Sequence, residues 1–405
     1  MRETQFKITE IGTIPQDWKI ISLGEIGEPR MCRRILKEQT QISGEIPFYK
    51  IGTFGYDADA YIPRTLFEEY KNKYYYPNKG DVLISAAGTI GRLVVFSGQE
   101  AYYQDSNIVW IENDENIVIN SFLYHSLYGT SWDTSQGTIS RLYNHSLKAK
   151  KISVPSSLDE QCKIAKALSD IDGLIDSLSK LIEKKKNIKT GTMQQLLTGK
   201  KRLAGFSEAW EKRKLGEVFD FMKGAGLSKE KLISTGKYKC MLYGEIFTRF
   251  NYMTNAEFNK TNSTEGVLSH VGDILMPGST TTNGNDLVKA VMITEDDVQL
   301  GGDIIILRKK ENNIDSYFWA SLISHIDKSK IAEMTQGTTI IHLHSKNLSE
   351  ITYLIPPSKE EQIAIAEILM SMDTEISSLE AKKEKYELIK KGMMQELLTG
   401  RVRLV

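Results

Sequence analysis

The chain has 405 residues, which is enough for two or more domains, and its 40% hydrophobic and 26% charged residues are ordinary for a globular protein. The 52 basic and 52 acidic side chains cancel, so a nucleic-acid binder of this composition would have to concentrate its positive charge locally. No apolar run is long enough for a transmembrane helix, and the first residues lack the apolar core of a signal peptide, so we expect a cytoplasmic protein. The three cysteines lie far apart, so we expect free thiols and no zinc site.

Residues 1–155 have the pattern of a mixed α/β domain. Short β-type runs at 81–85, 93–96 and 108–111 are separated by turns that contain glycine. Residues 121–128 have the pattern of a short helix. We therefore expect a twisted mixed sheet with few helices.

Basic, hydroxylated and amide side chains are spread along this first domain. Such side chains contact phosphates and read base edges, although each taken singly is more simply a solvated surface residue. The candidates for nucleic-acid contact are Arg30, Arg33, Arg34, Lys37, Lys50, Ser85, Thr89, Arg92, Arg141 and Asn144.

Residues 157–199 are typical of one long helix. Ser157 and Glu160 form a capping-box pattern, in which the glutamate turns back to the cap, and Gly199 stands where a left-handed C-cap is expected. Apolar residues recur in alternating steps of four and three, which is the narrow seam of a coiled coil. The seam residues are Ile164, Leu168, Ile171, Ile175, Leu178 and Ile182.

Residues 201–356 repeat the first domain more loosely. Gly80-Asp81 returns as Gly272-Asp273, the tripeptide at 136–138 returns at 336–338, and further strand and helix patterns occur at 303–307 and 316–326. The candidates for nucleic-acid contact in this second domain are Lys223, Lys229, Tyr243, Arg249, Thr280, Thr281, Asn283, Lys289, His342, His344 and Lys346.

The long helix itself returns at residues 358–400, and the two copies agree at about half of their positions. In both copies acidic residues come first and lysines follow, so an antiparallel pair would place each acidic half beside a basic half. We expect an antiparallel coil with a pseudo-twofold axis and one domain at each end. The second seam consists of Ile365, Leu369, Met372, Ile376 and Leu379.

Catalytic patterns are missing from the sequence. It has no phosphate-binding loop, no nucleophile elbow, no zinc-protease motif and no adenine-methyltransferase signature. Asp159, Glu160 and Lys163 could be imagined in a nuclease site, but a helix cap explains them better. His342 and His344 could share one face of a strand, yet no further metal ligand is evident nearby. We expect no catalysis by this chain alone.

The repeated residues resemble a known family. Pro155, Glu160-Gln161, Ile164-Ala165, Leu168 and Asp172, followed by Leu-Leu-Thr-Gly and repeated after a second variable region, are similar to the DNA-specificity (S) subunit of Type I restriction-modification systems. The motifs at Trp18, Leu23-Gly24-Glu25, Gly80-Asp81 and Gly88-Thr-Ile-Gly91 agree with this resemblance, which covers essentially the whole chain. The segment 278–284 departs from the Gly-Thr-Ile-Gly pattern, which fits two domains that read different sequences.

The resemblance implies a division of labour along the chain. Two target recognition domains, at 1–155 and 201–356, would each read one half of a bipartite site in double-stranded DNA. Spacer helices at 156–200 and 357–405 would fix their separation and dock two modification (methyltransferase) subunits, joined by restriction subunits. S-adenosylmethionine, ATP and Mg would bind to those partners, and none of them to this chain.

A second class of function fits the same architecture. A non-catalytic scaffold whose coil spaces two protein-binding domains would also suit the zero net charge. Binding to a bipartite duplex with a steep salt dependence would separate DNA recognition from this alternative.

Overall fold

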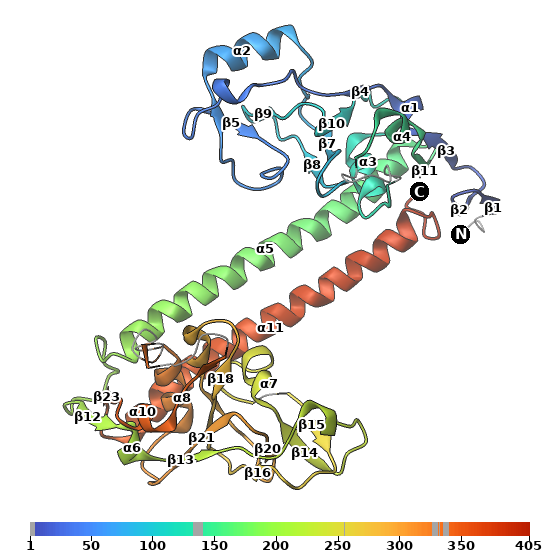
Figure 1. Ribbon diagram of the computed structural model, residues 1–405. Coiled ribbons are helices and arrows are strands. Elements are labelled where there is room, and N and C mark those ends of the chain that lie inside the picture. Colours follow the sequence, from blue (N-terminus) through green and yellow to red (C-terminus); the bar gives the residue numbers. More distant parts are fainter. Residues whose placement is uncertain (1–4, 133–140, 255, 326–330, 332, 335–339) are drawn as a thin grey trace. The chain divides into compact units, whose positions relative to one another are not determined.

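The computed structural model describes residues 5–132, 141–254, 256–325, 331, 333–334 and 340–405 (Figure 1). The chain forms two compact units: unit 1 is Met1–Ser179 with Ala381–Val405, and unit 2 is Lys180–Glu380. The predicted long helices are α5 (Leu158–Leu196) and α11 (Lys359–Leu397), and each unit contains a part of both. The repeated tripeptides at 136–138 and 336–338 lie outside the described residues.

Unit 1 is a mixed α/β domain, as predicted. Its strands and helices are β1 (Phe6–Thr9), β2 (Gly12–Pro15), β3 (Lys19–Ser22), α1 (Leu23–Ile26), β4 (Pro29–Arg30), η1 (Lys37–Gln39), β5 (Ile46–Tyr49), β6 (Tyr61–Ile62), α2 (Arg64–Lys73), β7 (Val82–Ser85), β8 (Leu93–Val95), β9 (Tyr102–Tyr103), β10 (Ile108–Ile111), α3 (Asn120–Leu127), α4 (Asn144–Ala149) and β11 (Lys151–Val154). The strands predicted at 81–85, 93–96 and 108–111 are confirmed as β7, β8 and β10, and the helix predicted at 121–128 is α3.

Two sheets organise unit 1. An antiparallel sheet has the order β4-β10-β7-β8, and a mixed sheet has the order β6-β5-β9, in which β5 and β9 are parallel. Strands β7 and β10 are buried along their whole length, which explains their continuous apolar runs. One core, with Trp18, Leu23 and Phe122 at 0% exposure, includes Ile164 and Leu168 of α5. A second core, built on Phe67 and Tyr102, lies under α2.

Unit 2 repeats this plan. Its strands and helices are β12 (Glu211–Lys214), α6 (Leu215–Val218), β13 (Phe219–Lys223), η2 (Lys229–Lys231), β14 (Tyr238–Met241), α7 (Tyr243–Thr248), β15 (Asn259–Thr261), β16 (Val267–Leu268), β17 (Ile274–Pro277), β18 (Ser279–Thr280), η3 (Gly284–Leu287), β19 (Val291–Met292), β20 (Gln299–Leu300), β21 (Ile304–Lys309), α8 (Ser316–His325), β22 (Ile341–His342), α10 (Ser345–Ser349) and β23 (Thr352–Ile355). The antiparallel sheet β13-β21-β17-β19 corresponds to β4-β10-β7-β8, and the parallel pair β14·β20 corresponds to β5·β9.

The start of each long helix is anchored by a repeated glutamine. In unit 1 the Gln161 side chain donates to Pro155 O (2.9 Å) and accepts from Ile119 N (3.0 Å). In unit 2 Gln362 donates to Pro356 O (3.1 Å) and accepts from Asp315 N (3.0 Å). The repeated glutamine therefore supplies hydrogen bonds to backbone groups of the loop in front of α3 in unit 1 and of the loop in front of α8 in unit 2. These backbone groups would otherwise lack partners.

The glutamate at the start of each long helix does not make the contact that the capping-box pattern predicts. Ser157 Oγ accepts from Glu160 N (3.4 Å), but the Glu160 carboxylate does not turn back to the cap. Both of its oxygens accept from Arg403, at 2.5 and 2.8 Å. In unit 2 Glu361 accepts from Arg202 in the same way, at 2.7 Å for each oxygen. An arginine from the end of one long helix thus meets the buried start of the other.

Parts of α5 and α11 pack antiparallel within each unit, as predicted (Figure 1). In unit 1 Lys390 pairs with Asp172 (2.6 Å), and in unit 2 the equivalent Lys189 pairs with Asp373 (2.5 Å). Both helices end at a left-handed glycine, Gly199 (φ 67°) and Gly400 (φ 68°), which confirms the predicted C-caps.

The predicted seam residues differ in their surroundings. Ile164 and Leu168 lie in the core of unit 1, and the equivalent Ile365 and Leu369 lie in the core of unit 2. Further along the two helices the buried seam residues are Ile171, Leu178, Ile182 and Ile376, and the half-buried ones are Ile175, Met372 and Leu379.

Within the described ranges no helix is long and apolar enough to cross a membrane.

Candidate nucleic-acid interface

The turn between β7 and β8 carries several unit 1 candidates. Ser85, which is 1% exposed, donates to Thr89 O (2.5 Å) and accepts from Arg92 N (2.8 Å), so its hydroxyl holds the turn and is not free for a ligand. A Cβ at Gly91 (φ 82°) would lie 2.2 Å from Trp132 Nε1, which explains why glycine stands there. Thr89 is exposed in this rigid turn.

Three segments of unit 1 meet at this turn. Arg92 donates to Phe54 O (2.7 Å) and stacks over the ring of the exposed Tyr56 (4.7 Å). Arg141 donates to Ser106 O (3.0 Å) and forms a β-bridge with Ala87. Of the other candidates in unit 1, Lys50 pairs with Asp59 (2.8 Å), and Asn144 is exposed in the first turn of α4.

A second group of unit 1 candidates combines cations with tyrosines that the sequence analysis did not select. The guanidinium of Arg30 lies 4.0 Å from the centroid of the Tyr75 ring, and that of Arg33 lies 5.2 Å from the Tyr74 ring. Glu112 partly neutralises Arg30 through an ion pair of 2.7 Å. Arg33, Arg34 and Lys37 are exposed. The signal that could have found the rings is the run of three tyrosines that follows α2.

A cleft of about 700 Å³ gathers candidates of unit 2. It lies between α7 and the segment from β18 to η3, and Tyr243, Thr280, Thr281 and Lys289 line it. Lys289 is half-buried, and burial lowers the pKa of its ammonium group. Asn285 and Asp286 are among the polar residues of this cleft that the sequence did not indicate, because short polar loop residues carry no periodic signal.

A neighbouring cavity of about 760 Å³ is rich in glycine. Lys223, Lys229 and Tyr243 line it together with several glycines, so Tyr243 belongs to both cavities. Lys223 pairs with Asp303 (3.1 Å), which also accepts from Ser279 Oγ (3.0 Å).

The remaining unit 2 candidates do not join one site. Arg249 is held by Glu245 (2.5 Å), and Asn283 caps η3 by accepting from Asn285 N (2.9 Å). His342 lies in β22, opposite Ser279 of β18, whereas His344 and Lys346 lie at the start of α10. Over the described ranges no group of three or more His, Cys, Asp or Glu side chains is arranged to hold a metal ion.

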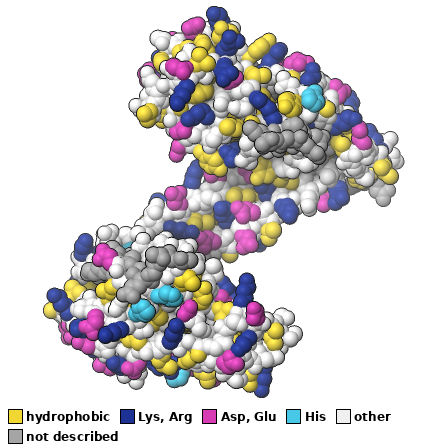
Figure 2. Space-filling model, viewed as in Figure 1, with side chains coloured by type: hydrophobic (Ala, Val, Ile, Leu, Met, Phe, Trp, Pro, Cys, Tyr) yellow, Lys and Arg dark blue, Asp and Glu magenta, His cyan; other side chains and the backbone are white. Residues whose placement is uncertain are grey.

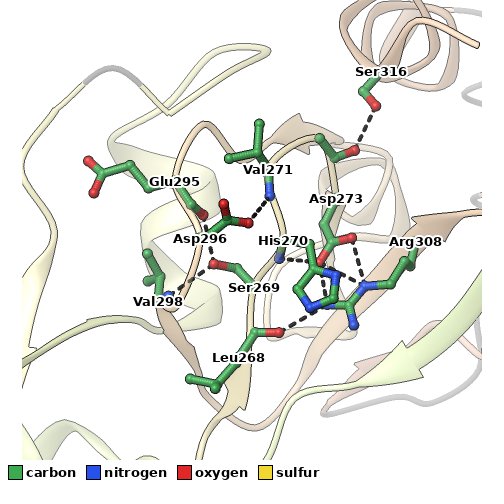
Figure 3. A network of polar contacts seen from close by, with 11 residues as sticks. Leu268, Ser269, His270, Val271, Asp273, Glu295, Asp296, Val298, Arg308 and Ser316 are labelled. Atoms are coloured by element: carbon green, nitrogen blue, oxygen red, sulfur yellow. Dashed lines mark hydrogen bonds and ion pairs between the residues drawn. The ribbon is translucent and has the colours of Figure 1, made fainter. Parts of the chain in front are cut away.

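The repeated Gly-Asp motif supports the strands that lead to both surfaces. Asp273 precedes β17, accepts from His270 N (2.9 Å) and forms a bidentate ion pair with Arg308 (Figure 3). The equivalent Asp81 accepts from Asn78 N (2.7 Å) and from the Asn120 amide at 3.4 Å, and among the described residues it forms no ion pair. Burial raises the pKa of the Asp81 carboxyl.

Charge is distributed evenly on the visible face of the molecule. Figure 2 shows Lys and Arg side chains interspersed with Asp and Glu on both units, without one continuous basic surface. On this face the two signs of charge are therefore balanced over short distances.

The chain is similar in sequence to known proteins. A sequence profile of the family described as Type I restriction modification DNA specificity domain matches residues 15–188 and again residues 207–388. The chain is 57% identical over 162 residues to a putative type I restriction enzyme specificity subunit of Haemophilus influenzae, a match that covers 40% of this chain and 42% of that protein.

Two further likenesses extend over the whole chain. The putative type I restriction enzyme MjaX specificity subunit of Methanocaldococcus jannaschii is 27% identical over 440 residues, which covers 100% of this chain and 98% of that protein. The crystal structure of a Type I restriction-modification S subunit from M. genitalium shares the fold, with a TM-score of 0.64 at 16% identity over 97% of this chain and 98% of that one.

Proposed function

The chain belongs to the DNA specificity subunits of Type I restriction-modification systems, a non-catalytic family, and from this premise we propose that it recognises a bipartite duplex target with one half-site per globular domain. The observation that carries the proposal is the contrast within the repeat. The contacts of Gln161 and Glu160 recur at Gln362 and Glu361, whereas the exposed candidates differ in kind between the two domains. Two similar frames with different surfaces suit the reading of two different sequences.

We place the recognition domains at residues 1–155 and 201–356 and the spacer helices at 156–200 and 357–405. The ends of β11 at Val154 and β23 at Ile355 support these boundaries, because each strand is followed at once by the cap of a long helix. DNA contact is assigned to the two groups in unit 1 and to the two cavities in unit 2.

The long helices are the proposed docking site for two modification subunits, to which restriction subunits are added. S-adenosylmethionine, ATP and Mg would then act on those partners. This chain would contribute only the recognition of the DNA sequence.

Exchange of one domain tests the proposal. Residues 20–150 are replaced by the matching segment of a relative, and the variant is expressed with its modification subunits in a host whose methylome is then sequenced. We expect one half of the split target to change and the other to stay. A change in both halves would contradict independent reading.

Salt dependence separates the proposal from a protein-binding scaffold. Each phosphate contact made by Lys or Arg contributes about 0.9 to the slope of log affinity against log salt concentration. A specificity subunit with its modification partners should bind the bipartite duplex with a steep slope. A scaffold would show no preference for that duplex at any salt concentration.

A further inference from the structure

The two cavities of unit 2 differ in chemistry although they share a wall. Tyr243 and Gly244 line both, and Tyr243 is 37% exposed with its ring edge-on to Phe247. Any ligand that occupies both cavities at once therefore has to pass across this aromatic ring.

The first cavity carries balanced charge and mixed hydrogen-bonding groups. Asp286 supplies a carboxylate, Lys289 an ammonium group and Asn285 an amide, beside three threonine hydroxyls at 280–282. One oxygen of Asp286 accepts from the Thr282 hydroxyl, so the other oxygen is the one that would accept from a base. Lys289 donates to Phe247 O (3.2 Å), and among the described residues it forms no ion pair. A carboxylate repels phosphate, whereas Asp, Asn and Lys side chains are groups that pair with the edges of bases.

The second cavity has the opposite character. Its cations Lys223 and Lys229 are exposed, and its acid, Asp303, is already paired with Lys223 and Ser279. Gly244 is exposed, and a Cβ there or at Gly302 would meet nothing within 4 Å, so the backbone at these two glycines is open to the cavity. Gly224 is buried instead, and a Cβ there would lie 1.9 Å from Gly301 O. Backbone that is free of side chains, with lysines beside it, suits a phosphate oxygen.

We infer that the Asp286–Lys289 cavity reads base edges and that the neighbouring glycine-rich cavity contacts the sugar-phosphate backbone of the same half-site, with Tyr243 between them. This inference rests on the proposed function and assigns parts of one DNA surface. It makes Asp286 a specificity-determining residue, because a carboxylate at a base edge accepts from the exocyclic amino group of cytosine or adenine and is repelled by the carbonyl oxygens of guanine and thymine.

The substitution Asp286→Asn gives opposite results under the two assignments. If Asp286 faces a base edge, the amide changes the donor and acceptor pattern, and the preferred base changes in one half-site. If the cavity holds phosphate, removal of the negative charge strengthens binding to every duplex and leaves the preferred sequence unchanged. Asn285→Asp is the second variant, since it makes the converse change on an exposed side chain.

The experiment selects from a pool of duplexes with randomised sequence, using the full chain together with its modification subunits. Lys229→Ala is the matched control: it should keep the parental target, weaken all duplexes alike and lower the salt slope by about 0.9. Circular dichroism and thermal unfolding verify that each variant is folded.

Selection of a new base in one half-site by Asp286→Asn or Asn285→Asp, with the other half unchanged, supports the inference. Selection of the parental target by both folded variants, with equal or tighter binding, overturns it and leaves the proposed function intact. A parental protein that selects no split target would instead overturn the proposed function, and this assignment with it.

Discussion

Unit 1 and unit 2 place an equivalent arginine against an equivalent buried glutamate, but they surround it differently. Arg403 pairs with Glu160 and also with both oxygens of Asp17, at 2.8 and 2.9 Å. Arg202 pairs with Glu361 and donates to the backbone oxygen of Glu208 (2.9 Å). The ion pair with the helix start is retained because a glutamate that is 1% exposed needs a cation, whereas the outer contacts are free to vary.

The buried aspartates of the Gly-Asp motif also share one contact between the two units and differ in another. Each accepts from a backbone N–H three residues earlier, at Asn78 in unit 1 and at His270 in unit 2. Unit 2 adds a cation, Arg308, whose pKa is raised by its hydrogen bonds to Asp273, and the described part of unit 1 places no cation against Asp81. The backbone role is therefore shared, while the electrostatic environment belongs to each domain.

The largest expected effect comes from breaking the arginine pairs. Arg403→Ala and Arg202→Ala each leave a buried glutamate without its cation, which costs about 3–5 kcal/mol of unfolding free energy. Arg403→Ala should cost more, because Asp17 also loses its partner. Trp18 and Trp210 lie beside the two arginines, so tryptophan fluorescence during urea unfolding reports on both.

Arg401→Ala is the control for this prediction. Arg401 forms a loose ion pair of 3.7 Å with Glu396, and both side chains are exposed, so its loss should cost less than about 1 kcal/mol. If Arg403→Ala unfolds at the same urea concentration as Arg401→Ala, the buried pair does not stabilise the frame.

The two aspartates should respond unequally to the same substitution. Asp273→Asn removes a carboxylate that carries a bidentate ion pair, and we expect a loss of about 2–3 kcal/mol. Asp81→Asn replaces a carboxylate that burial already disfavours, so the change should stay within about 1 kcal/mol at neutral pH. Thermal unfolding of both variants tests the contrast, and equal losses would contradict it.

The pH dependence of Asp81→Asn sharpens this comparison. Burial raises the pKa of Asp81 above its ordinary value of 3.8, so the folded protein binds this proton more tightly than the unfolded chain does. The parental stability contributed by this group therefore falls as pH rises from near 3.8 through the folded pKa. The difference in unfolding free energy, parent minus Asp81→Asn, should decrease with pH over this interval, and a difference that increases would reverse the sign.

A smaller effect than at the buried ion pairs is expected at the exposed cations of unit 1. Arg33→Ala with Arg34→Ala should weaken duplex binding about tenfold at low salt and reduce the salt slope by up to about 2, because two phosphate contacts are lost. Lys19→Ala with Lys79→Ala removes the same charge from exposed positions of unit 1 outside the candidate groups and serves as the control. Equal affinity of the arginine variant and the parent at low salt would remove this group from the interface.

Local and periodic features of this protein were determined by the sequence itself. The repeat, the extent of the two long helices, their glycine C-caps and the buried strands β7 and β10 follow from side-chain periodicity and from residues a few positions apart. The resemblance to the family depended on the same repeated residues, because they form the frame and their contacts require particular side chains.

Contacts between residues far apart in the chain were decided only by the tertiary structure. Glu160 looks like a capping residue locally, but Arg403 lies 243 residues away and takes the carboxylate. Ser85 is a candidate for nucleic-acid contact by residue type, yet its hydroxyl is used inside the turn. The rings of Tyr74 and Tyr75 beside Arg33 and Arg30, and the meeting of Asp286 with Tyr243 in one cleft, likewise join segments that are distant in the chain. Loop residues carry no periodic pattern, so the sequence alone does not place these side chains next to one another.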